Sequence, residues 1–181
     1  TLKRVGEEAK RFAKRALIVT GKSSTKKSGS LEEVVNSLTS NNLQVEIFNN
    51  VEPDPSIETV EQGAKVAREC AVDVVIGLGG GSAVDAAKGI ALLMTNKGRV
   101  DRYFGIDKVE KQALPIIAIP TTAGTGSEVT KYAVITDRKK MLKQIIGSPH
   151  ISPRLAILDP IVTLTMPPSL TANTGMDALS H

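Results

Sequence analysis

The sequence lacks tryptophan, and its aromatic residues make up only 3% of the chain. Proteins that bind nucleic acid commonly use aromatic side chains to stack against bases, so this scarcity argues against nucleic acid as a partner. Cys70 is the single cysteine and cannot form an internal disulfide. Because the sequence carries no mark of an oxidising compartment, we expect a cytoplasmic protein.

Long apolar runs are also missing. No segment approaches the roughly 20 apolar residues needed to span a bilayer, and the basic N-terminal stretch is not followed by the apolar segment of a signal peptide. We therefore expect no membrane partner. The 181 residues suit one complete domain, or one domain and the start of another, and 41% hydrophobic residues are enough to form a core.

Positive charge is unevenly distributed. The net charge is +4, but residues 1–27 contain nine Lys or Arg and two Glu, a local balance of +7, and the remaining residues balance to −3. Because the aromatic partners of a nucleic-acid interface are missing, we expect this basic segment to meet a small anionic ligand instead.

Helix-like and strand-like apolar patterns alternate along the chain. Helices are expected at 3–15, 31–41, 57–69, 83–94 and 171–179, and strands at 16–20, 45–48, 72–78, 116–119, 132–136 and 156–158. The run Val72–Leu78 lacks polar alternation, which is typical of a strand buried on both faces. The alternation predicts an α/β fold, a Rossmann-like parallel sheet with helices on both faces.

Three glycines, Gly79, Gly80 and Gly81, follow the buried strand and precede a helix. Backbone N–H groups at a helix N-terminus, unobstructed by side chains, suit a phosphate group. Ser82 and Asp85 fit a capping box, as do Ser30 and Glu33 before the helix at 31–41. The segment alone fits a tight strand-to-helix turn equally well, and it matches neither the dinucleotide motif G-x-G-x-x-G nor a Walker A loop.

A second polar loop, residues 120–128, follows the strand at 116–119 and reads Pro-Thr-Thr-Ala-Gly-Thr-Gly-Ser-Glu. Its hydroxyl groups and glycines could bind a ligand that lies across the strand ends. A merely solvated loop is the alternative. Two such loops after two buried strands favour a ligand site.

Asp177 and His181 are four residues apart in the last expected helix. That spacing places a carboxylate and an imidazole on one helix face, where both could bind a divalent cation. A solvent-facing pair is the alternative, and a zinc centre needs about four ligands. Any metal site would therefore need further ligands.

Taken together, four segments resemble the iron-containing (group III) alcohol dehydrogenases of the dehydroquinate synthase-like superfamily, in order and in spacing. They are Gly79-Gly80-Gly81-Ser82-x-x-Asp85-x-x-Lys88, the loop 120–130, Asp159-Pro160 and the segment 174–181. The resemblance implies a dinucleotide-binding α/β domain at residues 1–166, with 167–181 opening an all-helical metal-binding domain whose remainder is absent. The active site of such proteins lies between the domains.

The resemblance also implies residue roles. It places Gly79, Gly80, Gly81, Ser82 and Asp85 at the pyrophosphate turn, with Thr121, Thr122 and Thr125 on the adenosine and phosphate side. Asp54 would lie beside the adenosine ribose, and Tyr132, Lys143 and Thr163 near the nicotinamide half. Asp177 and His181 match the first two metal ligands, for Fe²⁺ or alternatively Zn²⁺.

Gly21 departs from many NAD-dependent relatives, which carry Asp there to bind the ribose 2′-hydroxyl and repel a 2′-phosphate. The following hydroxyls and lysines favour an anion. We therefore expect NADP rather than NAD, with Ser23, Ser24 and either Lys26 or Lys27 at the 2′-phosphate, although a solvated lysine loop is the alternative.

The implied reaction is hydride transfer between a primary alcohol and its aldehyde in a homodimeric enzyme. A glycerol or other polyol dehydrogenase of the same superfamily is an alternative, and so is a stand-alone nucleotide-binding module. We expect the 181-residue chain by itself to bind dinucleotide weakly and not to catalyse, because one wall of the cleft would be missing.

Overall fold

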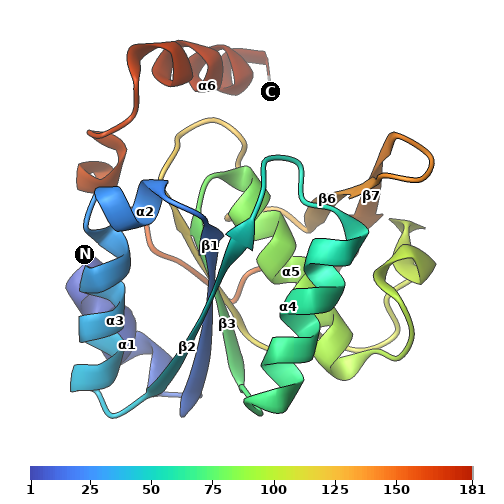
Figure 1. The fold of residues 1–181 in the computed structure, drawn as a ribbon, viewed down its shortest axis with the longest axis horizontal. Helices are drawn as coiled ribbons and strands as arrows, with labels where there is room; N and C mark the ends of the chain where they lie inside the picture. The colour runs from blue at the N-terminus through green and yellow to red at the C-terminus, as the bar shows by residue number, and fades with distance from the viewer. Residues whose placement is uncertain (181) are drawn as a thin grey trace.

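A computed structural model describes residues 1–180 and shows a five-stranded parallel sheet (Figure 1). The strand order is β2-β1-β3-β5-β8. The bounds are β1 Arg15–Gly21, β2 Gln44–Val51, β3 Val74–Gly79, β5 Ile116–Pro120 and β8 Leu155–Ala156. The predicted Rossmann-like parallel sheet is confirmed.

Helices cover both faces of this sheet. The α-helices are α1 Val5–Ala9, α2 Ser24–Lys27, α3 Ser30–Ser40, α4 Ile57–Glu69, α5 Gly81–Thr95 and α6 Pro168–Ser180. Short 3₁₀ turns occupy Leu2–Arg4, Val100–Tyr103, Pro149–Ile151 and Pro160–Thr163. One buried cluster joins α4 and α5 to Leu17 and Val19, and another joins α1 and α3 to Ile18 and Ile76. Alternate residues of β1 thus face opposite cores.

Helix α5 lies close to the sheet because β3 carries a glycine beneath it. A Cβ atom at Gly77 would lie 3.0 Å from Val84 Cα and 3.1 Å from Ala87 Cβ. All residues of β3 are buried. The close packing fixes the N-terminus of α5 directly at the carboxyl end of β3.

A second, three-stranded sheet was not predicted. It contains β4 Gly105–Ile106, β7 Leu142–Gly147 and β6 Tyr132–Asp137, with β6 and β7 antiparallel. The strand expected at 132–136 exists, but its placement in the parallel sheet was wrong. The Asp137 carboxylate accepts hydrogen bonds from the amides of Lys139 and Lys140, which turns the chain back on itself.

The helix expected at 3–15 was too long. α1 ends at Ala9, and β1 begins at Arg15. The Asp73 carboxylate accepts hydrogen bonds from the amides of Lys14 and Arg15, which fixes this segment at the entry to the sheet. A contact distant in sequence therefore overrides the local helical pattern.

Neither expected capping box forms. Gly29, with φ 78°, precedes α3, and the Ser30 hydroxyl donates to Thr25 O instead. Gly80 precedes α5 without a side-chain cap, while Ser82 Oγ accepts from the Asp54 amide. Asp85 Oδ2 accepts from the amide of Val134 in β6. These side chains bind neighbouring segments, not their own helix ends.

Helix α6 lies across the carboxyl ends of the strands (Figure 1). None of its described residues is buried. It approaches the loop after β5 at Gly124, where a Cβ atom would lie 2.5 Å from Thr174 O. No helix within residues 1–180 combines the length and apolar character that crossing a membrane requires.

Candidate functional site

Two hollows lie over the carboxyl ends of the parallel strands. They measure about 390 and 470 Å³ and share Ser24, Gly80 and Ser82, so together they form one groove. From β1 the chain continues to β2 on one side of the sheet, and from β3 it continues to β5 on the other. Ligands of open α/β sheets bind at such a switch point.

The inner part of the groove is formed by the glycine turn that opens α5. A Cβ atom at Gly81 would lie 2.9 Å from Thr125 Cγ2, and one at Gly80 would lie 3.4 Å from Thr122 Oγ1. The first-turn amides of a helix have no partner within the helix. Side chains at these positions would therefore fill the space from which an anion reaches those amides.

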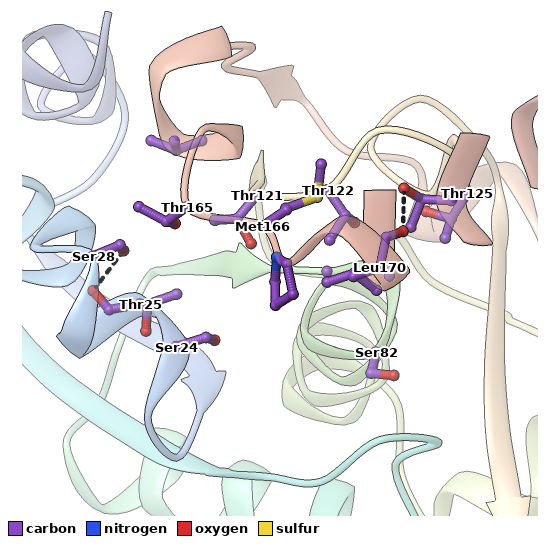
Figure 2. A pocket seen from close by; sticks show the side chains of 15 residues that line it. Ser24, Thr25, Ser28, Ser82, Thr121, Thr122, Thr125, Thr165, Met166 and Leu170 are labelled. Carbon is purple, nitrogen blue, oxygen red and sulfur yellow. Dashed lines mark hydrogen bonds between the residues drawn. The ribbon is translucent and has the colours of Figure 1, made fainter. Parts of the chain in front are cut away.

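Threonines of the loop after β5 form the opposite wall. Thr121, Thr122 and Thr125 all line the first hollow, and the Thr121 amide donates to Gly79 O over 2.9 Å. In Figure 2 these threonines lie on one side of the hollow, and the α2 residues Ser24 and Thr25 lie on the other. The structure thus brings together the two loops that the sequence analysis paired.

The outer hollow lies between the ends of β1 and β2. Gly21, Lys22, Ser23 and Ser24 line it, whereas Lys26 and Lys27 do not. A Cβ atom at Gly21 would meet only Val51 O, at an ordinary 3.6 Å, so the position has room for a side chain. Ser23 and Ser24 thus border this hollow, and Lys22 is the lysine that lines it; their contact with a 2′-phosphate stays a prediction.

Glu52 also lines the outer hollow, and the sequence analysis missed it. Its Oε1 lies 2.8 Å from Arg138 Nη2, and both its carboxylate oxygens accept from the Thr59 hydroxyl. Burial works to raise the pKa of Glu52, but hydrogen bonds from Thr59 and Ser56 outweigh it and lower that pKa. The sequence feature that could have identified Glu52 is its position directly before the Pro53–Ser56 turn.

Several predicted nucleotide contacts lie outside both hollows. Asp54 is paired with Lys143 at 2.8 Å on the surface, and Tyr132 is exposed at the start of β6. The Thr163 hydroxyl donates to Pro160 O. Asp85 is buried behind the glycine turn, and burial raises its pKa although the Val134 amide and the Lys88 charge oppose the shift.

Residues before and within α6 form the roof of the inner hollow. Thr165, Met166, Leu170 and Thr174 line it together with Gly80 and Gly81, and Figure 2 shows Met166 close to Thr121 and Thr122. The sequence pattern predicted metal ligands at the end of this segment but not its contribution to the groove. The sequence feature that could have identified these residues is their position shortly before Asp177.

The structure describes one of the two expected metal ligands. Asp177 lies on α6, and His181 lies outside the described residues. Within residues 1–180, no three His, Cys, Asp or Glu side chains come together as a metal site. The described part of the chain therefore offers one of the two expected ligands.

Comparisons with known proteins agree with this geometry. The family model of iron-containing alcohol dehydrogenases matches residues 1–160. The NAD-dependent methanol dehydrogenase of Bacillus methanolicus is 43% identical over 181 residues, which covers 99% of this chain and 47% of that protein. The NADPH-dependent butanol dehydrogenase of Clostridium saccharobutylicum is 39% identical over 172 residues, covering 93% and 44%.

Among solved structures, an archaeal halo-thermophilic alcohol dehydrogenase from a Red Sea brine pool superposes with a TM-score of 0.95 at 40% identity. The match covers 100% of this chain and 47% of that one. The chain thus spans less than half the length of the curated relatives it matches.

Proposed function

The chain belongs to the iron-containing alcohol dehydrogenase family, and from that premise we propose that its groove binds NADP(H) in preference to NAD(H). The observation that carries this proposal is the glycine turn at the N-terminus of α5, set at the switch point of the sheet. Amides at that position suit a pyrophosphate, and the two hollows on either side suit the two halves of a dinucleotide.

The preference for NADP(H) rests on the outer hollow. Gly21 places no carboxylate there, while Lys22, Ser23 and Ser24 offer one cation and two hydroxyls to a 2′-phosphate. The relatives include an NAD-dependent and an NADPH-dependent enzyme, so family membership leaves the choice open. Glu52 lines the same hollow, but its ion pair with Arg138 offsets its negative charge, which limits its repulsion of a phosphate.

For the whole protein we propose oxidation of a primary alcohol or reduction of its aldehyde, with a polyol as the alternative substrate. When bound, the nicotinamide supplies the hydride carrier and a divalent metal supplies a Lewis acid. Asp177 and His181 would contribute ligands to Fe²⁺, or alternatively Zn²⁺. The described residues provide only the carboxylate. A homodimeric assembly and a cytoplasmic location stay predictions.

The deciding experiment is a calorimetric titration with NADPH and NADH of the protein expressed from its complete reading frame. We expect tighter binding of NADPH, and we expect Gly21→Asp to weaken NADPH binding by about tenfold or more without weakening NADH, because a carboxylate repels the 2′-phosphate. Gly21→Ala is the matched control, since it adds a Cβ atom without charge. Equal or tighter NADH binding by the unaltered protein would refute the preference.

A further inference from the structure

The outer hollow contains a carboxylate as well as a lysine. Glu52, which directly follows β2, lines it together with Gly21 and Lys22. In a dinucleotide site, a carboxylate at this end of the groove accepts a hydrogen bond from the ribose 2′-hydroxyl and repels a 2′-phosphate. Gly21 offers no such group at the end of β1. The charge of Glu52 therefore bears on which nucleotide this hollow accepts.

Glu52 is held by the start of helix α4. The Ser56 amide donates to Oε1 at 3.1 Å, and the Thr59 hydroxyl lies 2.7 Å from Oε2. Ser56 is the N-cap of α4, and the N-terminal end of a helix stabilises negative charge. Burial works to raise the pKa of Glu52, but the hydrogen bonds from Thr59 and Ser56 outweigh it and lower that pKa. The carboxylate therefore stays charged and in place by means of α4 alone.

One oxygen of this carboxylate has capacity for a further donor. A carboxylate offers about four lone-pair sites. Within the described residues, Oε1 accepts from the Ser56 amide, the Thr59 hydroxyl and the Arg138 guanidinium, whereas Oε2 accepts only from Thr59. The single hydroxyl proton of Thr59 serves one of the two oxygens at a time. Glu52 can thus accept a hydrogen bond from a ribose hydroxyl in the hollow.

Arg138 reaches Glu52 from the β6–β7 hairpin and lines neither hollow. Its Nη2 atom lies 2.8 Å from Glu52 Oε1. The Thr136 amide donates to Pro55 O over 2.8 Å, which places the end of β6 beside the turn that follows β2 (Figure 1). The Arg138 side chain is 60% exposed, and that of Glu52 is 23% exposed. Substitution of Arg138 therefore changes the ion pair without disturbing a core.

Three side chains determine the charge of the outer hollow. Lys22 and Arg138 are cations and Glu52 is an anion, which leaves a balance of +1. Without Arg138 the balance is zero, and the carboxylate is no longer offset. A 2′-phosphate carries about two negative charges and needs the excess cation, whereas a ribose hydroxyl is neutral and needs only the acceptor. The charge of Arg138 therefore favours one nucleotide over the other.

We infer that Arg138 sets the preference between NADPH and NADH by offsetting the charge of Glu52, whose carboxylate accepts from a ribose hydroxyl when NADH binds. Arg138 acts through Glu52 and does not itself line the groove. This inference rests on the proposed nucleotide binding. It adds two residues, one of them on the hairpin, to those that choose the nucleotide.

The test compares Arg138→Met, Glu52→Gln and the double variant in the protein expressed from its complete reading frame. Arg138→Lys restores the charge without the guanidinium group. Lys139→Met is the matched control, because it removes the neighbouring exposed cation of the same hairpin. For each protein we would measure the dissociation constants of NADPH and NADH by calorimetry, in dilute buffer and in about 1 M salt, and the thermal midpoint as a check of folding.

We expect Arg138→Met to raise the dissociation constant of NADPH by about fivefold and to leave that of NADH unchanged or lower. Arg138→Lys should keep most of the preference, and Lys139→Met should keep all of it. Glu52→Gln should raise the dissociation constant of NADH by about threefold, since a neutral amide oxygen is a weaker acceptor than a carboxylate.

The double variant isolates the coupling between the two residues. In the Glu52→Gln background, Arg138→Met should no longer change the ratio of the two dissociation constants, because no carboxylate charge is left to offset. In about 1 M salt the effect of Arg138→Met on the Glu52 protein should shrink, since ions screen an exposed pair.

Other outcomes separate the two proposals. An unchanged ratio in Arg138→Met, or the same change with and without the Glu52 carboxylate, would overturn the role of Arg138 and leave the proposed function intact. An equal change in Lys139→Met would also overturn it, because any cation of the hairpin would then suffice. If the unaltered protein binds neither nucleotide, the proposed function and this inference both fail. If it binds NADH as tightly as NADPH, the preference is refuted, and the ratio in Arg138→Met still decides the role of Arg138.

Discussion

The inner and outer parts of the groove are built differently. The inner part presents backbone amides at Gly80 and Gly81, held in place by buried contacts beneath them. The outer part presents the side chains of Lys22, Ser23 and Glu52 near the protein surface. Backbone groups cannot be exchanged by substitution, whereas side chains can. For the dinucleotide proposed above, the inner part would be a constant site for the pyrophosphate, beside an adjustable site for the ribose.

The largest expected effect comes from filling the inner part. Gly81→Val should weaken NADPH and NADH alike, by roughly 100-fold, since its Cβ atom and methyl groups would occupy the space beside Thr125. Gly81→Ala should cost less, because the Thr125 side chain can rotate away. Calorimetry on both variants checks this. Selective loss of only one nucleotide would contradict a shared pyrophosphate site.

The burial of Lys88 in α5 should make the stability of the protein depend on pH. The pKa of Lys88 is lowered from 10.5 to about 8 in the folded protein, so between these values the unfolded chain binds more protons. The free energy of unfolding should therefore rise with pH from about 8 to 10.5, by up to about 3 kcal/mol from this group.

Denaturant unfolding of the unaltered protein and of Lys88→Met across that range measures this contribution. As pH rises, the free energy of unfolding of the unaltered protein should increase relative to that of Lys88→Met. Lys22→Met is the matched control, because the exposed Lys22 side chain has no burial cost in the folded state. A pH-independent difference for Lys88→Met would show that the group bears no such cost.

The roof of the groove can be disturbed at Gly124. A Cβ atom there would lie 2.5 Å from the carbonyl oxygen of Thr174, and a backbone atom cannot rotate away. Gly124→Ala should therefore displace α6, which carries Asp177. We expect steady-state turnover to fall by about tenfold and NADPH affinity to change less. An affinity loss larger than the turnover loss would place the damage in the threonine loop instead.

The smallest expected effect concerns the outer part. Lys22→Ala should weaken NADPH binding by about fivefold and leave NADH binding unchanged, because an exposed charge contributes on the order of 1 kcal/mol. Lys27→Ala is the matched control and should change neither affinity. If instead Lys27→Ala weakens NADPH binding and Lys22→Ala does not, the lysine at the 2′-phosphate is Lys27, as the sequence predicted for Lys26 or Lys27.

Local patterns predicted the parts of the fold that depend on local composition. The unbroken apolar run at Val72–Leu78 predicted a buried strand, and three glycines after it predicted the turn. The β6–β7 hairpin was not predictable in this way. Its position depends on Asp85 binding the Val134 amide and on the Thr136 amide binding Pro55 O, contacts between residues far apart in sequence.

For the candidate site too, local sequence patterns predict only the residues that lie next to a recognisable strand or turn. Ser23 and Ser24 could be predicted to line a groove because a hydroxyl-rich segment follows an apolar strand. Sequence alone could not rank Lys22 above Lys26 and Lys27, since that ranking depends on how α2 is oriented over the strand ends. Roof residues such as Met166 and Leu170 come from a segment distant in sequence, and only the folded chain brings them to the groove.

The strand order has a consequence for how the chain reaches this fold. β5 follows β3 in the sheet after α5 and β4, but β8, the outer neighbour of β5, begins only at Leu155, after the whole hairpin has been made. During synthesis, four strands and the glycine turn can therefore assemble while one apolar edge of β5 is still unpaired. Such an edge invites pairing with another chain, so we expect the interval before Leu155 emerges to be the stage most prone to aggregation.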